Sequence, residues 1–230
     1  CESTSSPSLS IASSKVTKRD GKNEPLDLNK LHVMVDEACT DLAGVSASQV
    51  EMQSGIQFYD GITTAEIQEI LIRSASDLID LDHPNYQFVA ARLLLFALRK
   101  QLYGRMHEVP SVKQYTEQCI GRGVYDAEIL NLYNDEEFDK LQSFIDHDRD
   151  YLFTYAGLRQ VVDKYLVQDR SSNTVYETPQ FMYLLIAATI FSKYPTETRL
   201  DYVKKYYDAI SKHKINIPTP IMAGVRTPLR

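Results

Sequence analysis

The chain has 230 residues, of which 43% are apolar, and its 25 Lys and Arg against 31 Asp and Glu give a net charge of −6. This length and composition suffice for one large domain or for two of ordinary size, each with its own core. The acidic balance argues against a general nucleic-acid binder, because surfaces that track phosphates usually make a whole domain basic. Any anion site must therefore be local.

The longest apolar run extends from Phe181 to Phe191, which is shorter than the roughly 18 residues that a membrane span requires. It predicts a core helix, and we expect no membrane span. Cys1, Cys39 and Cys119 are far apart and form no CxxC pair. They predict neither a disulfide framework nor a zinc cluster and fit a reducing cytoplasm, with Cys39 and Cys119 as buried, inert thiols.

Residues 1–14, "CESTSSPSLSIASS", have the composition of a disordered, Ser-rich tail. A mature lipoprotein can begin in this way, with a lipidated cysteine and a polar tether, and so can a partial reading frame. A lipid-anchored helical domain is therefore one alternative for this chain, and it rests on Cys1 alone.

Residues 15–27 alternate in polarity and contain Asp20-Gly21, a dipeptide that favours a tight turn. They predict a small two-stranded hairpin. Asp27 is placed to cap the first helix, and that helix carries an apolar face at helical spacing. The face consists of Leu31, Val35, Ala38 and Leu42.

Three further helices complete a first domain of about 90 residues. Ser48 with Glu51 and Thr63 with Glu66 have the spacing of capping boxes, which predicts that the second and third helices begin there. Pro84 precedes a fourth helix that runs to Gly104.

Beyond Gly104 the pattern stays helical, apart from a second hairpin in "YLVQDRSSNTVYETP", where a Ser-Ser-Asn turn separates two strand-like segments. Pro179 then opens the next helix. The helical segments are "SVKQYTEQCIGRG", "DEEFDKLQSFID", "DYLFTYAGLRQVVDKYL", "TPQFMYLLIAATIFSKY" and "ETRLDYVKKYYDAISKHK".

Neither GxxxxGK nor GxGxxG occurs in the chain, so a bound nucleotide would need cationic side chains in place of a glycine-rich loop. Thr64 fits such a site, because Thr63 serves as the cap and leaves the next hydroxyl available beside a helix N-terminus. Basic residues on a hairpin are, alternatively, simply solvated. The candidate cations are Lys18, Arg19, Lys22, Lys30, Arg99 and Lys100.

The stretch "DHDRD", Asp146 to Asp150, has three carboxylates and a histidine within five residues. A metal site is one interpretation, and helix capping is the other, because neighbouring side chains point in different directions. The remaining histidines have no evident serine or cysteine partner, so we assign no hydrolase triad and no metal site.

Seven segments together resemble one known family. From about residue 15 to the last residue, in the same order and with similar spacing, they are similar to the N-terminal part of the large (alpha) subunit of class I ribonucleotide reductase. The segments are "VTKRDGKNEPLDLNKLH", "IQFYDGITTAEIQE", "PNYQFVAARLLLFALRK", "FIDHDRDYLFTYAG", "KYLVQDR…YETPQF", "ETRLDYVKKYYDAIS" and "PTPIMAGVRTP".

The resemblance implies a mainly α fold. A regulatory ATP-cone, a four-helix unit with a small β-hairpin cap, would occupy residues 15–104. A helical N-terminal domain with a short β-hairpin would follow at residues 105–213. Residues 214–230 would be the first strand of an incomplete α/β barrel.

In that family the cone binds ATP as activator or dATP as inhibitor, with Mg²⁺. Many members carry a histidine where this chain has Gln68, so the resemblance supports binding more firmly than inhibition by dATP. Thr219 matches a threonine that contacts the substrate nucleoside diphosphate. The effector contacts would be Lys18, Glu24, Pro25, Leu26, Asp27, Leu28, Asn29, Lys30, Thr64 and Lys100.

The family reduces ribonucleoside diphosphates to deoxyribonucleoside diphosphates for DNA synthesis, in the cytoplasm. A small (beta) subunit with a metal centre supplies a radical, and thioredoxin or glutaredoxin re-reduces the enzyme. In the family a Gln-Phe-x-x-Cys segment with the first redox cysteine follows "RTPxR", and this sequence ends at Arg230. The resemblance therefore assigns no catalytic residue and no cofactor for chemistry to residues 1–230.

We expect this chain to be the N-terminal piece of a large subunit, either of one longer chain or of a split enzyme, and to be inactive alone. Its partners would be the rest of the large subunit and the beta subunit, without direct contact to nucleic acid or membrane. The alternative is a free-standing module that senses ATP or dATP without catalysis.

Overall fold

The computed structural model describes residues 15–228, so the tail expected at residues 1–14 lies outside the described part. The fold is mainly helical with two small sheets, as expected. It divides into two compact units: the first runs up to Ala97 and includes Thr154–Ala156, and the second comprises Leu98–Phe153 and the chain from Gly157 onward. None of the helices within residues 15–228 has the length and apolar character that crossing a membrane demands.

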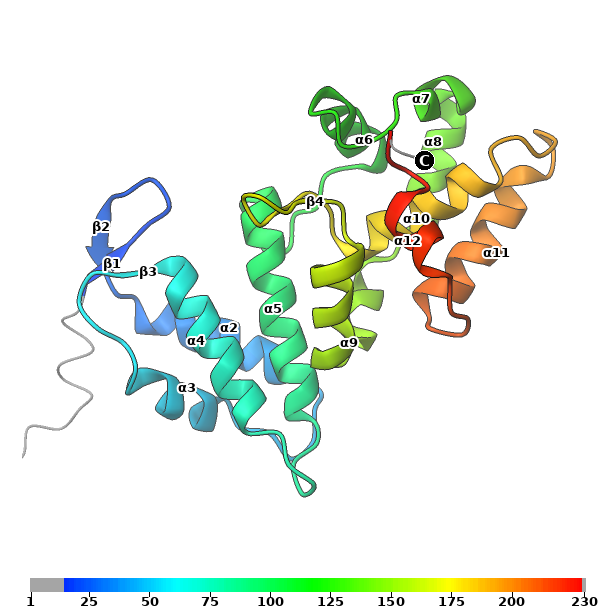
Figure 1. Cartoon of the computed structure of the whole chain (residues 1–230). Helices are drawn as coiled ribbons and strands as arrows, with labels where there is room; N and C mark the ends of the chain where they lie inside the picture. The colour runs from blue at the N-terminus through cyan, green and yellow to red at the C-terminus, as the bar shows by residue number, and fades with distance from the viewer. Residues whose placement is uncertain (1–14, 229–230) are drawn as a thin grey trace, which may run out of the picture. The chain divides into compact units, whose positions relative to one another are not determined.

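The first unit begins with a three-stranded sheet in the order β2-β1-β3 (Figure 1). The predicted hairpin is confirmed, with Gly21 at φ +82° in its turn, a conformation that glycine adopts without steric cost. The third strand runs parallel to the first and was not predicted. The strands are β1 (Lys15–Thr17), β2 (Asn23–Pro25) and β3 (Ile62–Thr63).

Four helices complete this part of the chain, as predicted. Asp27 caps the first, and Thr63 with Glu66 forms the capping box of the third. The capping box at Ser48 is wrong: Ser46 has the extended backbone of an N-cap, and its hydroxyl accepts the Gln49 amide at 3.3 Å. The helices are α2 (Leu28–Cys39), α3 (Ala47–Gly55), α4 (Thr64–Asp77) and α5 (Tyr86–Tyr103).

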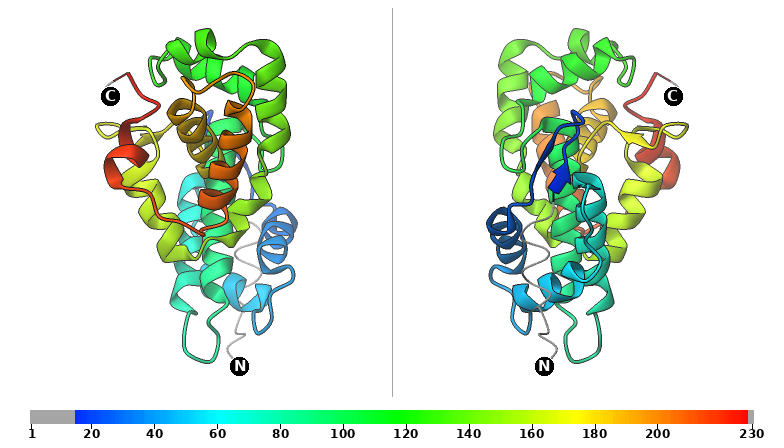
Figure 2. Two further views of the ribbon diagram at one scale, coloured as in Figure 1. Left: turned by 90° about the vertical axis from the view of Figure 1, so that its right-hand side faces the viewer. Right: turned by 90° about the vertical axis from the view of Figure 1, so that its left-hand side faces the viewer.

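In the second unit, α10 (Pro179–Ile190) lies at the centre, and all ten residues from Pro179 to Ala188 are buried. It is in contact with α11 (Arg199–Ser211), which lies beside it in Figure 2. The other predicted helices at the start of this unit are confirmed as α6 (Val112–Gly121) and α8 (Asp135–Phe144), and a short α7 (Glu128–Leu132) was not predicted. The second hairpin is confirmed as β4 (Gln168–Asp169) and β5 (Thr174–Val175).

The segment from Asp150 to Leu166 is not one helix as predicted. It comprises the end of a 3₁₀ helix, η1 (His147–Leu152), then α9 (Tyr155–Gln160), and then a π-helical turn, η2 (Val161–Tyr165). Phe153 interrupts it with an extended backbone (φ −70°, ψ 137°). The π turn closes where the Leu166 amide donates to the Val161 carbonyl at 3.0 Å.

The strand expected within residues 214–230 is also wrong for the part that is described. Pro218 is extended, and α12 (Thr219–Gly224), with a proline in its first turn, follows. A strand needs a neighbouring strand for its N–H and C=O groups, and within residues 15–228 the apolar residues around Ile215 have none. Proline in the first helical turn is compatible with a helix start, because its missing N–H would be unpaired there anyway.

Candidate functional site

Three of the expected effector contacts lie on or beside the β1–β2 hairpin. Lys18 follows β1, and its Nζ lies 3.5 Å from the Glu24 carboxylate on β2. Because β3 runs parallel to β1 with Thr63 opposite Thr17, α4 begins at the turn end of the hairpin. There the Thr64 hydroxyl donates to the Thr17 carbonyl at 3.4 Å. The sheet thus brings Lys18, Glu24 and Thr64 to one end.

The stretch from Glu24 to Lys30 leads from this end into α2. Asp27 uses one carboxylate oxygen as a helix cap, since Oδ1 receives the amides of Asn29 and Lys30 at 3.0 and 3.2 Å. Leu26 is buried, and the remaining residues of the stretch are exposed. Asp27 therefore has a structural role in starting the helix, and the exposed side chains of Glu24 and Lys30 are the ones placed to reach a ligand.

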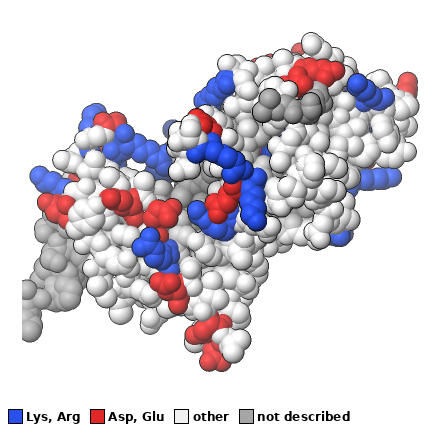
Figure 3. Space-filling model, viewed as in Figure 1, with Lys and Arg blue, Asp and Glu red and all other residues white. Residues whose placement is uncertain are grey.

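The charge distribution agrees with an anion site at the hairpin. Figure 3 shows Lys and Arg side chains gathered over β1 and β2. Two carboxylates lie among them: Glu24 against Lys18, and Asp20 at 3.8 Å from Lys22. Ion pairs this exposed are weak, so an incoming polyanion can compete for both lysines.

Arg99 and Lys100 differ although they are neighbours in the last turns of α5. Arg99 is buried, and its Nη2 donates to the His147 carbonyl at 2.9 Å and to the Asp150 carboxylate at 3.3 Å. These contacts hold Arg99 in the core, so we exclude it as a residue that binds a nucleotide. Lys100 is half-buried and, like Arg99, belongs to the second unit, whereas the other expected effector contacts belong to the first.

Gln68 lies four residues after Thr64 on α4, so both side chains lie on the same face of that helix. Gln68 is 8% exposed. Its side chain is therefore largely enclosed by the first unit.

The Asp146–Asp150 stretch has a structural role: it caps the 3₁₀ helix η1 and places Asp150 in the core. Asp146 is the N-cap of η1 and accepts the Asp148 amide at 3.0 Å. Asp150 is fully buried, receives Gln180 Nε2 at 2.8 Å, and has its pKa raised to about 6 because burial outweighs the Arg99 guanidinium. Burial and the same guanidinium lower the pKa of His147 to about 4. Within residues 15–228 no three His, Cys, Asp or Glu side chains gather as a metal site would need.

Two described cysteines have unreactive surroundings. Cys119 is buried and Cys39 is half-buried, and both are free thiols. Burial raises the pKa of each to about 11, so almost none of either thiol is ionised at neutral pH.

Thr219, the expected substrate contact, opens α12 in the second unit. Its side chain is exposed, and its Oγ1 lies 3.5 Å from the hydroxyl of Tyr165 at the end of η2. Tyr165 and the Glu177 and Arg226 side chains that hold this region carry no recognisable signal in the sequence. These contacts join residues 49 to 61 positions apart, and no local pattern signals such a pairing.

Comparisons with known proteins match both parts of the chain. Residues 14–101 match the family described as "ATP cone domain", and residues 151–230 match "Ribonucleotide reductase, all-alpha domain". The chain is 52% identical over 215 residues to "Ribonucleoside-diphosphate reductase 1 subunit alpha" of Escherichia coli (strain K12). It is 41% identical over 217 residues to the subunit alpha of Enterobacteria phage T4 and 36% identical over 214 residues to that of Helicobacter pylori.

These alignments cover 94%, 94% and 92% of this chain, but only 28%, 28% and 26% of the respective relatives. The chain thus spans less than a third of the length of the relatives that it matches. It carries an ATP cone followed by a ribonucleotide reductase all-alpha domain, and over 94% of its length it is similar to the N-terminal region of class I ribonucleotide reductase alpha subunits.

Proposed function

We propose that this chain binds ATP or dATP as an allosteric effector and forms the N-terminal part of a ribonucleoside-diphosphate reductase large subunit. The cone would comprise residues 15–104 and the helical domain residues 105–213. The observation that carries the proposal is the arrangement of Lys18, Glu24 and Thr64 at one end of the sheet, inside a region that matches the ATP cone family.

The chemistry of these side chains suits a nucleoside triphosphate with Mg²⁺. Lys18 and Lys30 supply positive charge for the phosphates. The Thr64 hydroxyl lies in the first turn of α4, where backbone N–H groups favour anions. Glu24 can accept a hydrogen bond from a ribose hydroxyl or an adenine amino group once Lys18 turns to the phosphates.

Calorimetric titration with ATP and with dATP tests effector binding. Each charge-assisted hydrogen bond contributes about 1.5 to 3 kcal/mol, so Lys18→Ala and Lys30→Ala should each weaken binding by roughly 10-fold to 150-fold. Lys204→Ala is the matched control, because that lysine lies on α11 of the second unit and pairs with Asp208. Absence of heat from both nucleotides, or unchanged affinity in both variants, rejects the site.

The reductase part of the proposal concerns the complete enzyme. Thr219 would contact the ribonucleoside diphosphate, a beta subunit would supply the radical, and thioredoxin or glutaredoxin would restore the reduced state. Burial raises the pKa of both Cys39 and Cys119 to about 11, so neither offers a ready thiolate for disulfide exchange. We therefore expect no reduction of ribonucleoside diphosphates by this chain with a beta subunit and a dithiol alone, measured by separation of labelled products. Turnover in that mixture would contradict the proposal.

A further inference from the structure

Arg226, two residues after α12, is the most completely hydrogen-bonded cation of the second unit among the described residues. Only 3% of it is exposed. Its Nε donates to both oxygens of Glu177 at 3.0 Å, its Nη1 to the Met222 carbonyl at 2.6 Å, and its Nη2 to the Tyr165 carbonyl at 3.1 Å and to Glu177. All three nitrogens of the guanidinium are thus in use within the protein, which excludes Arg226 as a binding group for an outside anion.

Glu177 is equally enclosed, at 0% exposure. Besides Arg226, it accepts the Tyr125 hydroxyl at 2.5 Å and the Val167 amide at 2.9 Å. A buried carboxylate is stable only when its lone pairs are satisfied in this way. The pair therefore forms a fixed point between the segment that precedes α7, the start of the β4–β5 hairpin and the end of α12.

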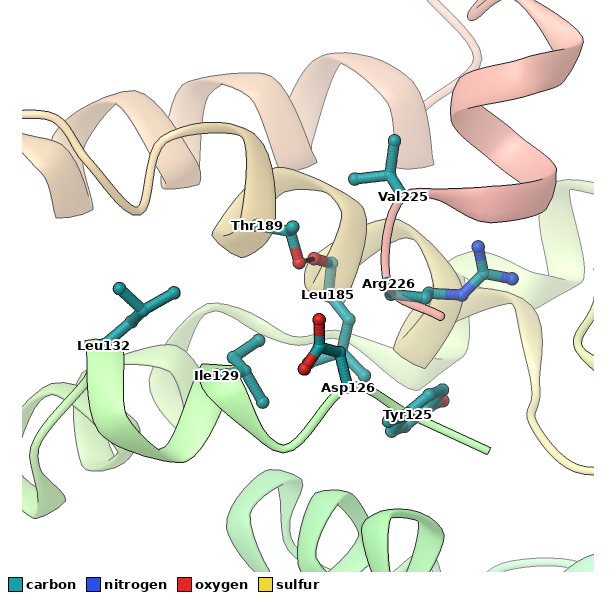
Figure 4. A pocket seen from close by; sticks show the side chains of 8 residues that line it. All are labelled: Tyr125, Asp126, Ile129, Leu132, Leu185, Thr189, Val225 and Arg226. Atoms are coloured by element: carbon teal, nitrogen blue, oxygen red, sulfur yellow. Dashed lines mark hydrogen bonds between the residues drawn. The ribbon is translucent and has the colours of Figure 1, made fainter. Parts of the chain in front are cut away.

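One backbone contact extends this fixed point. The Asp126 amide donates to the Arg226 carbonyl at 3.1 Å, so both the side chain and the main chain of Arg226 are held. Figure 4 shows Tyr125, Asp126 and Arg226 around one small pocket, with the segment after α12 passing over α10.

Tyr165 links the fixed point to Thr219. Its carbonyl accepts from Arg226, and its hydroxyl lies 3.5 Å from Thr219 Oγ1 at the other end of α12. Arg226 also bonds the Met222 carbonyl within α12. The short helix is thereby in contact with this arrangement at two places, Met222 and Thr219.

An apolar pair of similar volume could hold α12 without the cost of removing two charges from water. An apolar contact, however, has no preferred direction, whereas a guanidinium that donates to a carboxylate and two carbonyls has one geometry. The ion pair therefore fixes the orientation of α12 as well as its position.

We propose that Glu177 and Arg226 are positioning residues, which act through Tyr165 to aim the Thr219 hydroxyl at a bound ribonucleoside diphosphate. This inference rests on the proposed reductase function. Neither Glu177 nor Arg226 touches the substrate; Thr219 is the contact, and Tyr165 sets its direction.

The test uses the complete large subunit that carries this segment, assembled with its beta subunit, and measures KM and kcat for a ribonucleoside diphosphate. Tyr165→Phe keeps the carbonyl that Arg226 needs and removes only the hydroxyl near Thr219. One neutral hydrogen bond corresponds to about a 5-fold change, so we expect KM to rise about 5-fold and kcat to change less than 2-fold. Arg226→Lys should raise KM by about 10-fold, because an ammonium cannot donate hydrogen bonds in the fixed directions of the planar guanidinium.

A double-mutant cycle separates positioning from a general loss of structure. In a Thr219→Ala background, Arg226→Lys and Tyr165→Phe should leave KM unchanged, because the group that they aim is gone. Rises in KM of equal size in both backgrounds, or no rise for either variant when Thr219 is present, overturn the inference. If Arg226→Lys does not fold, the Tyr165→Phe pair of measurements decides alone.

Effector binding serves as the control. Calorimetry with ATP should give the same affinity for Tyr165→Phe as for the unmodified protein, since the cone residues Lys18 and Thr64 are untouched. An active unmodified enzyme with unaffected variants rejects the positioning role and leaves the proposed function standing. An unmodified enzyme that reduces no ribonucleoside diphosphate rejects the proposed function and this inference with it.

Discussion

Replacement of Arg99 by methionine isolates the contribution of one buried ion pair. The side chains of Arg99 and Asp150 are 4% and 0% exposed, and Nη2 and Oδ2 lie 3.3 Å apart. Methionine keeps most of the length of arginine and removes the charge. Asp150 then retains the hydrogen bond from Gln180 Nε2 at 2.8 Å and loses the cation with which it pairs.

The expected cost follows from the pKa of Asp150. In the native protein this pKa is about 6, so at pH 7.5 the ionised carboxylate is already disfavoured by about 3 kcal/mol relative to an unfolded aspartate of pKa about 3.9. Without Arg99 the buried Asp150 carboxyl becomes protonated. At pH 7.5 the protonation of a carboxyl with an unfolded pKa of about 3.9 costs about 5 kcal/mol. The difference of about 2 kcal/mol, with up to about 1 kcal/mol for the bond lost at the His147 carbonyl, gives about 2 to 3 kcal/mol.

The same reasoning fixes the pH dependence. An acid whose pKa is raised by folding holds its proton more tightly in the folded state, so this group stabilises the protein increasingly as pH falls from about 6 to about 4. At pH 5 Asp150 is mostly neutral with or without Arg99. The effect of Arg99→Met should therefore shrink to about 1 kcal/mol.

Urea denaturation followed by circular dichroism, at pH 7.5 and at pH 5, measures both values, with separate transitions fitted where the two units unfold separately. Arg105→Met is the matched control, since Arg105 and its partner Glu108 are each 70% exposed, and we expect a change below about 0.5 kcal/mol. A cost of Arg99→Met that is the same at both pH values, or below about 1 kcal/mol at pH 7.5, refutes the reasoning.

Three further predictions concern other parts of the chain. Ser46→Ala should lower the free energy of unfolding by about 1 kcal/mol and Ser48→Ala by less than about 0.5 kcal/mol in urea denaturation, because Ser46 is the cap; the reverse order would restore the predicted capping box. Cys39 and Cys119, with pKa values of about 11, should react with iodoacetamide at pH 7.5 on the order of 100-fold more slowly in the native than in the urea-unfolded protein. Peptide mass spectrometry measures this, and rates within 10-fold of each other would contradict the burial. Arg199→Met should cost about 3 to 5 kcal/mol, because it leaves a buried carboxylate without its cation, and a loss below about 1 kcal/mol in the same assay would show that the pair is dispensable.

The sequence predicted correctly those features of the fold that depend on residues a few positions apart. The Asp20-Gly21 turn and the cap at Asp27 were correct because each depends on residues within a few positions. β3 escaped prediction because a two-residue strand has no period of its own and exists only by pairing with β1. The Ser46 cap was missed by two residues, since "SASQ" offers two serines with similar spacing and the backbone selects the one in an extended conformation.

The candidate site shows the same limit. Lys18 was selected as a hairpin cation and lies half-buried after β1, beside Glu24. Arg99 was selected on equal grounds and instead pairs with Asp150, 51 residues further along the chain. Neighbouring residues on a helix point about 100° apart, so Arg99 and Lys100 necessarily have different surroundings, and only tertiary contacts decide which one meets solvent.

The π-helical turn at Val161–Tyr165 makes this region sensitive to changes in chain length. A π turn holds one residue more than an α turn closed over the same hydrogen bond. Removal of one residue from η2 would close that hydrogen bond over an α turn, and the residues inside the turn would take new directions. The Tyr165 carbonyl and hydroxyl, which meet Arg226 and Thr219 from opposite ends of one residue, could then no longer meet both. By contrast, the exposed Arg170–Asn173 turn of the next hairpin can gain or lose a residue without moving either contact. Natural variation in length among relatives should accordingly gather in that turn and avoid η2.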